Sequence, residues 1–292
     1  MSLGLLYTPP ACKSYYTMDC GTFFGTNMAQ PKPGHDAKHW ETILDQVIDG
    51  YLKGANHAQR LEYISWQTRN VYETVITGDR AAWLVEFLVY LITKNMASHP
   101  GNLAAVLAAL WNEGGDFARL ILAALGTVHK DALVHAATGW IVYSEFIAYF
   151  TKTRRREIKT INNASGNHAP FIALLRTAFG ASRSHQQGSS ALLTGATQCV
   201  KNVNRKTTIG MSEKWTDLSD FGFEPKFFLE YKHWDRWIDC FAGLAKDDDF
   251  LHKEDALMAV RIMGRKGKVF NPVGMAQNAL GMKSGPRYKK YP

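Results

Sequence analysis

The sequence contains few cysteines and no long apolar run, and both features limit the cellular compartments in which the protein is expected. Four cysteines in 292 residues are too few for a disulfide scaffold, so we expect reduced thiols. The longest uncharged stretch, residues 95–112, is broken by Asn, His, Pro and Gly and lacks the ~20 apolar residues of a membrane span. Residues 1–17 have no basic n-region and the first arginine is Arg60, so we expect neither a secretory signal nor a transit peptide. We therefore expect no membrane partner and a location in the cytoplasm or within a virion or other particle.

The motifs of many metal- and nucleotide-dependent enzymes are also missing. No nucleophile elbow, HExxH, GxGxxG or EF-hand loop is present. Residues 274–284 miss the P-loop pattern, because six residues separate the glycines and Met precedes Lys. The spacing of Cys12, Cys20, His35 and His39 does not match a zinc finger. We predict no cofactor, no metal and no enzymatic activity, although a helical active site assembled from dispersed residues remains an alternative.

Acidic residues are scarce in two segments of the second half, which gives the chain an uneven charge. Residues 151–214 contain 11 basic and 2 acidic residues, and residues 261–292 contain 8 basic and none acidic. Between them, residues 215–260 contain 5 basic and 11 acidic residues. Blocks of one sign create local potentials that attract polyanions. The alternative is that both basic blocks are solvated surfaces that keep the protein soluble.

Alternating β-branched runs are almost absent, so we predict an all-α fold. It would be a compact core of short antiparallel helices, because the connectors are short. Asp79 is expected to cap one helix, Gly126 to end another, and Pro225 to occupy the first position of a third. Apolar residues at helical spacing predict helices within residues 43–52, 57–76, 84–92, 103–111, 117–124, 133–150, 225–245, 256–263 and 273–280.

Composition divides the chain into four predicted regions. Residues 1–36 form an arm rich in Pro, Gly and aromatic residues, and residues 264–292 form a basic C-terminal arm. Between the arms we predict an N-terminal helical lobe at 37–150. A C-terminal helical lobe at 151–263 begins with the basic segment 151–214. The arms are expected to join copies into a homo-oligomer.

The candidate nucleic-acid-binding residues lie in the two basic blocks. Three consecutive arginines, Arg154, Arg155 and Arg156, exceed what the end of a helix needs for its dipole. Arginine also binds phosphate in a bidentate manner. A helical stripe that is typical of a core is formed by Phe227, Tyr231, Trp234, Ile238 and Phe241, and stacking of Tyr231, Trp234 or Trp237 on bases is the alternative. The other predicted contacts are Lys159, Arg176, Arg183, Lys201, Arg205, Lys206, Arg265, Lys266 and Lys268.

These features favour a nucleoprotein- or coat-like structural protein. It would bind the phosphate backbone of single-stranded nucleic acid, with RNA slightly favoured over DNA, without reading the base sequence. Helical nucleoproteins of RNA viruses share this general layout, which is an analogy of layout and rests on no motif. A scaffold subunit of a large protein or ribonucleoprotein assembly is the second hypothesis, and the enzyme with a dispersed helical site is the third.

Overall fold

The computed structural model describes residues 37–54, 58–134, 137–157, 168–180, 190–203, 208, 211, 215–224 and 227–264. These residues form an all-α fold, as the sequence predicts. Its helices are α2 (Ala37–Lys53), α3 (Ala58–Thr74), α4 (Arg80–Asn95), α5 (Pro100–Asn112), α6 (Phe117–Val134), α7 (Ala137–Glu157), α8 (Ala169–Phe179), α9 (Ser190–Asn202), α11 (Tyr231–Leu244) and α12 (Lys253–Met263). A 3₁₀ turn, η2 (Ser219–Phe221), lies between β1 (Trp215–Thr216) and β2 (Phe227–Phe228), which pair antiparallel.

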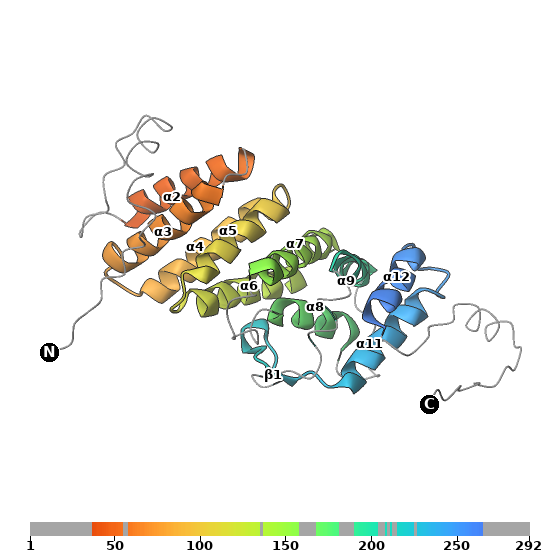
Figure 1. Cartoon of the computed structure of the whole chain (residues 1–292). Helices are drawn as coiled ribbons and strands as arrows, with labels where there is room; N and C mark the ends of the chain where they lie inside the picture. Colours follow the sequence, from red (N-terminus) through yellow and green to blue (C-terminus); the bar gives the residue numbers. More distant parts are fainter. Residues whose placement is uncertain are drawn as a thin grey trace, which may run out of the picture.

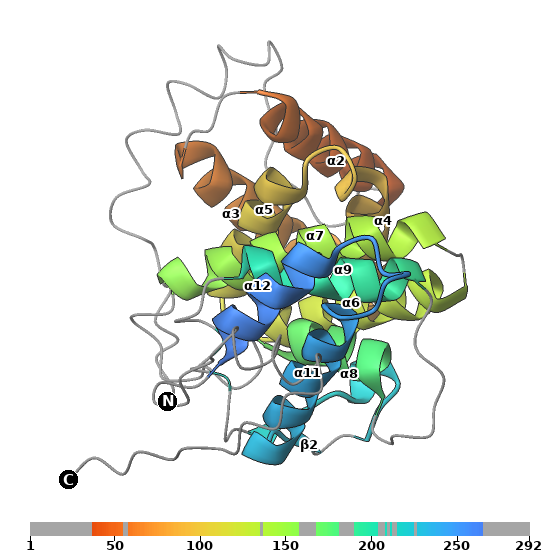
Figure 2. The ribbon, with the colours of Figure 1, turned by 90° about the vertical axis from the view of Figure 1, so that its right-hand side faces the viewer.

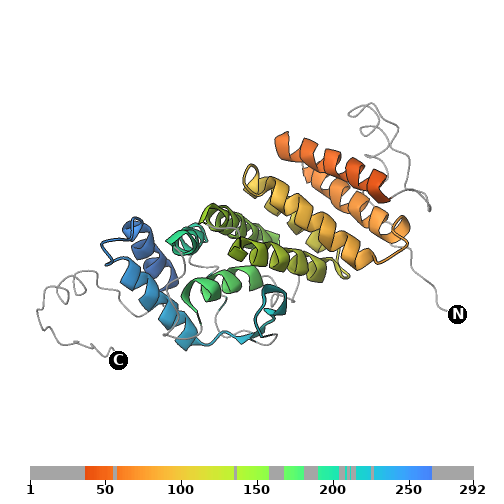
Figure 3. The same cartoon turned by 180° about the vertical axis from the view of Figure 1, so that it is seen from behind.

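The helices are arranged along an elongated molecule. Figure 1 shows α2 to α5 at one end, α6 and α7 in the middle, and α11 and α12 at the other end. The view from behind in Figure 3 shows the same order reversed. Figure 2 looks along this order, with α11 and α12 nearest the viewer. The arrangement places the first basic block, which starts at the end of α7, in the C-terminal half.

Local sequence signals explain where several helices begin and end. The Asp79 carboxylate accepts a hydrogen bond from the backbone N–H of Ala82 at 3.0 Å, which confirms the predicted cap of α4. Pro100 occupies the first turn of α5, where its missing N–H costs no helical hydrogen bond. Gly114 and Gly115 both have positive φ and separate α5 from α6, because other residues rarely adopt this conformation.

Two predicted helix ends are wrong, and tertiary contacts explain both. Gly126 does not end a helix but lies inside α6, where an added Cβ would approach the carbonyl oxygen of Asp220 to 2.2 Å. The glycine therefore allows η2 to pack directly on α6. Helix α11 begins at Tyr231 rather than at residue 225, because Phe227 pairs with Thr216 in the short ladder. At the actual start, the backbone N–H of Glu230 donates to His233 Nδ1 at 3.2 Å.

Helix α7 connects the two halves of the core. It packs against α5 on the N-terminal side and most extensively against α9 on the C-terminal side. Close contact with α9 depends on Gly195, where a Cβ would lie 2.5 Å from Ser144 Oγ. Buried hydrophobic residues form one cluster from Trp40 to Met263. The predicted lobes at 37–150 and 151–263 therefore share α7 and this cluster, and their division stays a prediction.

Candidate nucleic-acid interface

The arginine triplet occupies the last turn of α7. Helix α7 runs to Glu157, so the backbone of residues 154–156 is helical, while their side chains lie outside what the structure describes. Position 154 falls one turn after Phe150, which is fully buried, and position 156 falls one turn after Lys152, which is exposed. The triplet therefore includes a position that continues the buried face of α7 and a position that continues its exposed face. The negative end of the α7 dipole also favours cations at this terminus.

Arg176 lies on α8 and packs against two phenylalanines that follow η2 in the chain. Its guanidinium carbon is 4.6 Å from the ring centre of Phe223 and 4.6 Å from that of Phe227. Such cation–π contacts stabilise by about 0.5–2 kcal/mol each, depending on burial. The Nη1 atom is buried and has no hydrogen-bond partner among the described residues. Burial lowers the pKa of the Arg176 guanidinium, and the charge of Glu224 opposes that shift. Arg176 thus has an internal packing role, and its contact with nucleic acid stays a prediction.

Lys201 lies near the end of α9 and also makes an internal contact. Its ammonium group is 2.6 Å from Asp255 Oδ1 on α12, and about half of the lysine side chain remains exposed. His252 Nδ1 lies 3.8 Å from the other carboxylate oxygen of Asp255. An ion pair at this exposure contributes about 0–1 kcal/mol. A phosphate could therefore compete with Asp255 for Lys201 at little cost in stability.

Three of the predicted elements lie on helices that pack against one another. Helices α7, α8 and α9 pack against one another, so the triplet, Arg176 and Lys201 come from one packed group of helices. The remaining predicted residues lie outside the described part of the chain: Lys159, Arg183, Arg205, Lys206, Arg265, Lys266 and Lys268.

The aromatic stripe of α11 is mainly part of the core. Trp234 and Trp237 are each only 2% exposed, and Trp234 Nε1 donates to the carbonyl oxygen of Met263 at 3.0 Å. These two tryptophans cannot stack on a base in this conformation, so that alternative is wrong for them. Tyr231 is 39% exposed, at the first position of α11.

A buried histidine that the sequence analysis did not single out lies next to this group of helices. His129 on α6 is fully buried, and its Nε2 atom is 3.0 Å from Thr177 Oγ1 on α8. Its ring makes edge contacts with Trp140, Tyr143 and Phe221. Burial lowers the pKa of His129 to about 4, with a smaller contribution from the charge of Lys130. The His129–Thr177 pair is enclosed, so in this conformation it contacts no substrate.

The described residues show neither a metal-binding cluster nor a membrane-spanning helix. Among the described residues, no group of three or more His, Cys, Asp or Glu side chains is placed to hold a metal ion. Within the same part of the chain, no helix is both long and apolar enough to cross a bilayer.

Comparisons with known proteins give no family for this chain. No family model matches the sequence, and neither the curated proteins nor the solved structures contain a match. The function of this chain is therefore inferred from its own charge, burial and contacts.

Proposed function

We propose that this protein is a structural nucleic-acid-binding protein that coats a single strand, with RNA favoured, through contacts to the phosphate backbone. The observation that carries the proposal is the charge of residues 151–214, 11 basic against 2 acidic, which starts in the last turn of α7. Lysine and arginine side chains that neutralise phosphates release condensed counterions. The free energy of this release does not depend on the base sequence. The contact residues proposed are the predicted ones, beginning with Arg154, Arg155 and Arg156.

Self-association completes this function, because a coat requires contacts between neighbouring copies. Residues 1–36 and 264–292 are the proposed links. Residues 264–292 carry basic residues and no acidic ones, whereas residues 215–260 carry an acidic excess. Attraction between opposite charges of this kind favours association between copies, and added salt weakens this attraction.

The scaffold subunit is kept as a second candidate because two predicted contacts are engaged inside the molecule. Arg176 packs between two phenylalanine rings, and Lys201 pairs with Asp255. If most basic residues were engaged in this way, the charge blocks would serve the protein's own packing or acidic protein partners.

Purification without nuclease distinguishes the two candidates. We expect the purified protein to show a raised ratio of absorbance at 260 nm to that at 280 nm, in particles larger than one chain. Nuclease treatment should lower the ratio and reduce the particle size. A ratio typical of pure protein, with a complex that survives nuclease, would contradict nucleic-acid binding and support the scaffold.

A further inference from the structure

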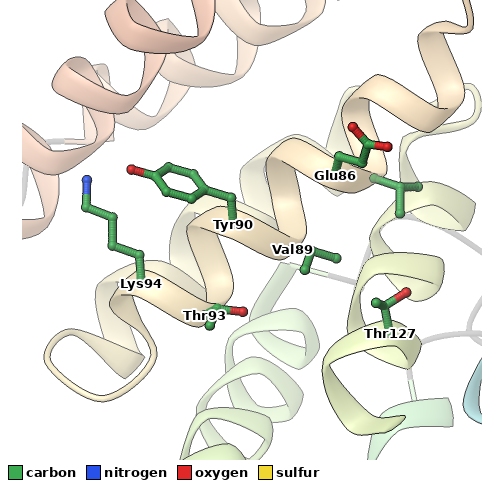
Figure 4. A pocket seen from close by; sticks show the side chains of 7 residues that line it. Glu86, Val89, Tyr90, Thr93, Lys94 and Thr127 are labelled. Atoms are coloured by element: carbon green, nitrogen blue, oxygen red, sulfur yellow. The ribbon is translucent and has the colours of Figure 1, made fainter. Parts of the chain in front are cut away.

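An open apolar groove lies between α4 and α6. Its volume is about 680 Å³, and its walls are formed mainly by apolar atoms of Val85, Glu86, Val89, Tyr90, Thr93 and Lys94 from α4, and of Thr127 from α6. Figure 4 shows Val89 and Thr127 on facing sides, while Tyr90 and Lys94 extend away from α6. The hydroxyl of Thr127 donates to the carbonyl of Ala123, 3.1 Å away, which leaves its methyl group for the groove.

The side of the groove formed by Tyr90 and Lys94 is joined to α2, close to where the described chain begins. Lys94 Nζ is 2.7 Å from Asp45 Oδ2, and the hydroxyl of Tyr90 donates to the same oxygen at 3.3 Å. Nearer the start of both helices, Trp83 Nε1 donates to Glu41 at 2.6 Å. The contacts follow the same order along both helices, so α2 runs in the direction of α4. Ala37 is eight residues before Asp45, or about 12 Å along the helix.

The 36 residues before Ala37 have the chemistry that such a groove would bind. They contain Tyr7, Tyr15, Tyr16, Phe23 and Phe24, together with three leucines, and their two lysines balance two aspartates. An aromatic side chain buries 150–250 Å² when it is covered. A segment without net charge and rich in aromatic residues therefore matches an apolar groove, whereas the basic segment 264–292 does not.

Chain direction and proline content favour the groove of another copy over the segment's own. Because α2 runs parallel to α4, Ala37 lies level with the start of α4, and the groove begins further along α4, at Val85. A turn back toward the groove is disfavoured by the sequence of residues 31–36, directly before Ala37. This stretch contains Pro31 and Pro33, which fix φ and bias the preceding residues toward extended conformations.

We propose that residues 1–36 of one copy occupy the α4–α6 groove of a second copy, and that the exchange is reciprocal. In a reciprocal exchange each copy is both donor and acceptor, which gives a closed two-fold pair. Once one segment has bound, the second binds at a high effective concentration. This inference rests on the self-association in the proposed function and identifies the surface that performs it.

Disulfide trapping in the full chain tests the exchange, because the segment already carries Cys12 and Cys20. One chain carries Thr127→Cys with both segment cysteines changed to serine, and a second, tagged chain keeps the native cysteines. After mixing and mild oxidation with copper phenanthroline, we expect a disulfide-linked heterodimer on a non-reducing gel. Mass spectrometry should join position 127 to Cys12 or Cys20. This link can form only between copies.

The matched control is Thr74→Cys on α3. Thr74 is also an exposed helical threonine that donates to the carbonyl four residues earlier, but it does not line the groove. We expect several-fold less heterodimer from this variant. Equal yields from the two positions, or a Thr127→Cys chain with native cysteines that links only within itself, would overturn the proposal.

Groove variants separate this inference from nucleic-acid binding. Val89→Asp places a charge in the groove and should break the reciprocal dimer, which lowers the mass seen in light scattering, whereas Val89→Thr keeps the branched shape and should not. Affinity for a short single strand that accommodates one copy should be equal in both variants. A dimer retained in Val89→Asp contradicts the groove assignment. A lack of strand binding in all variants contradicts only the proposed function, since the trapping result does not depend on it.

Discussion

Replacing Arg154, Arg155 and Arg156 with alanine is expected to weaken binding of a single-stranded RNA on the order of 100-fold at moderate salt. Each exposed ion pair contributes about 1 kcal/mol, and 1.4 kcal/mol corresponds to a tenfold change in affinity. Circular dichroism should remain helical, because the triplet forms only the last turn of α7. Fluorescence anisotropy with a labelled oligonucleotide measures the change.

Two comparisons interpret this triple variant. Replacing the three arginines with lysine keeps the charge and should retain most of the affinity, since the proposed binding is electrostatic. Single alanine variants should lose more affinity at position 156 than at position 154. Position 156 lies one helical turn after exposed Lys152, whereas position 154 lies one turn after buried Phe150. Unchanged affinity in the triple alanine variant would remove the triplet from the interface, and loss of helical signal would assign it a structural role.

Acid is expected to destabilise the protein through His129. The pKa of His129 is about 4 in the fold and 6.5 in a model peptide, so the unfolded chain binds the proton more tightly. The stability conferred by neutral His129 is present above pH 6.5 and is lost as the pH falls toward 4. Between pH 7 and pH 4.5 the loss amounts to about 2 kcal/mol, by linkage at 1.36 kcal/mol per pKa unit.

Urea unfolding at several pH values, compared with His129→Gln, measures this loss. Glutamine keeps a hydrogen-bonding group near Thr177 but does not titrate in this range. Carboxylates, including Asp220, whose pKa burial raises, contribute to both proteins and cancel in the difference. The free energy of unfolding of wild type should fall by about 2 kcal/mol more than that of the variant. Parallel pH profiles would show that His129 has access to water or a partner for its proton.

Local signals predicted the fold class and much of its N-terminal half. The apolar stripe of α2 buries Trp40, Leu44, Ile48 and Tyr51 on one face, as helical spacing requires. Asp79 caps α4, and the glycine pair at 114–115 separates two helices. Each of these features depends on residues within a few positions along the chain, which is why the sequence reveals them.

The remaining features depend on contacts between distant residues. Gly126 has the local appearance of a helix end, but its role is to let Asp220 approach α6. Phe227 continues the apolar stripe of α11 in sequence, yet it packs on Arg176 and pairs with Thr216. Helices α8 and α9 lie in the basic segment 151–214, where no helix is predicted from the sequence.

The candidate interface was predicted by charge, and charge alone does not reveal which basic residues are engaged internally. The sequence gives no indication that Arg176 lies between Phe223 and Phe227, or that Lys201 meets Asp255 on α12. One feature of the sequence pointed to His129: it lies within the apolar run that forms α6. A histidine in such a run is typically buried with a single hydrogen-bond partner. Only the packing of α8 on α6 identifies that partner as Thr177.

The salt dependence of RNA binding by the wild-type protein tests the central claim most directly. Affinity for a single-stranded oligonucleotide of mixed sequence should fall linearly with salt on a log–log plot, with a slope of about −0.7 for each phosphate neutralised. The slope should be the same for a second, unrelated base sequence, because only the backbone is contacted. Binding that is independent of salt, or no binding at low salt, would contradict the account.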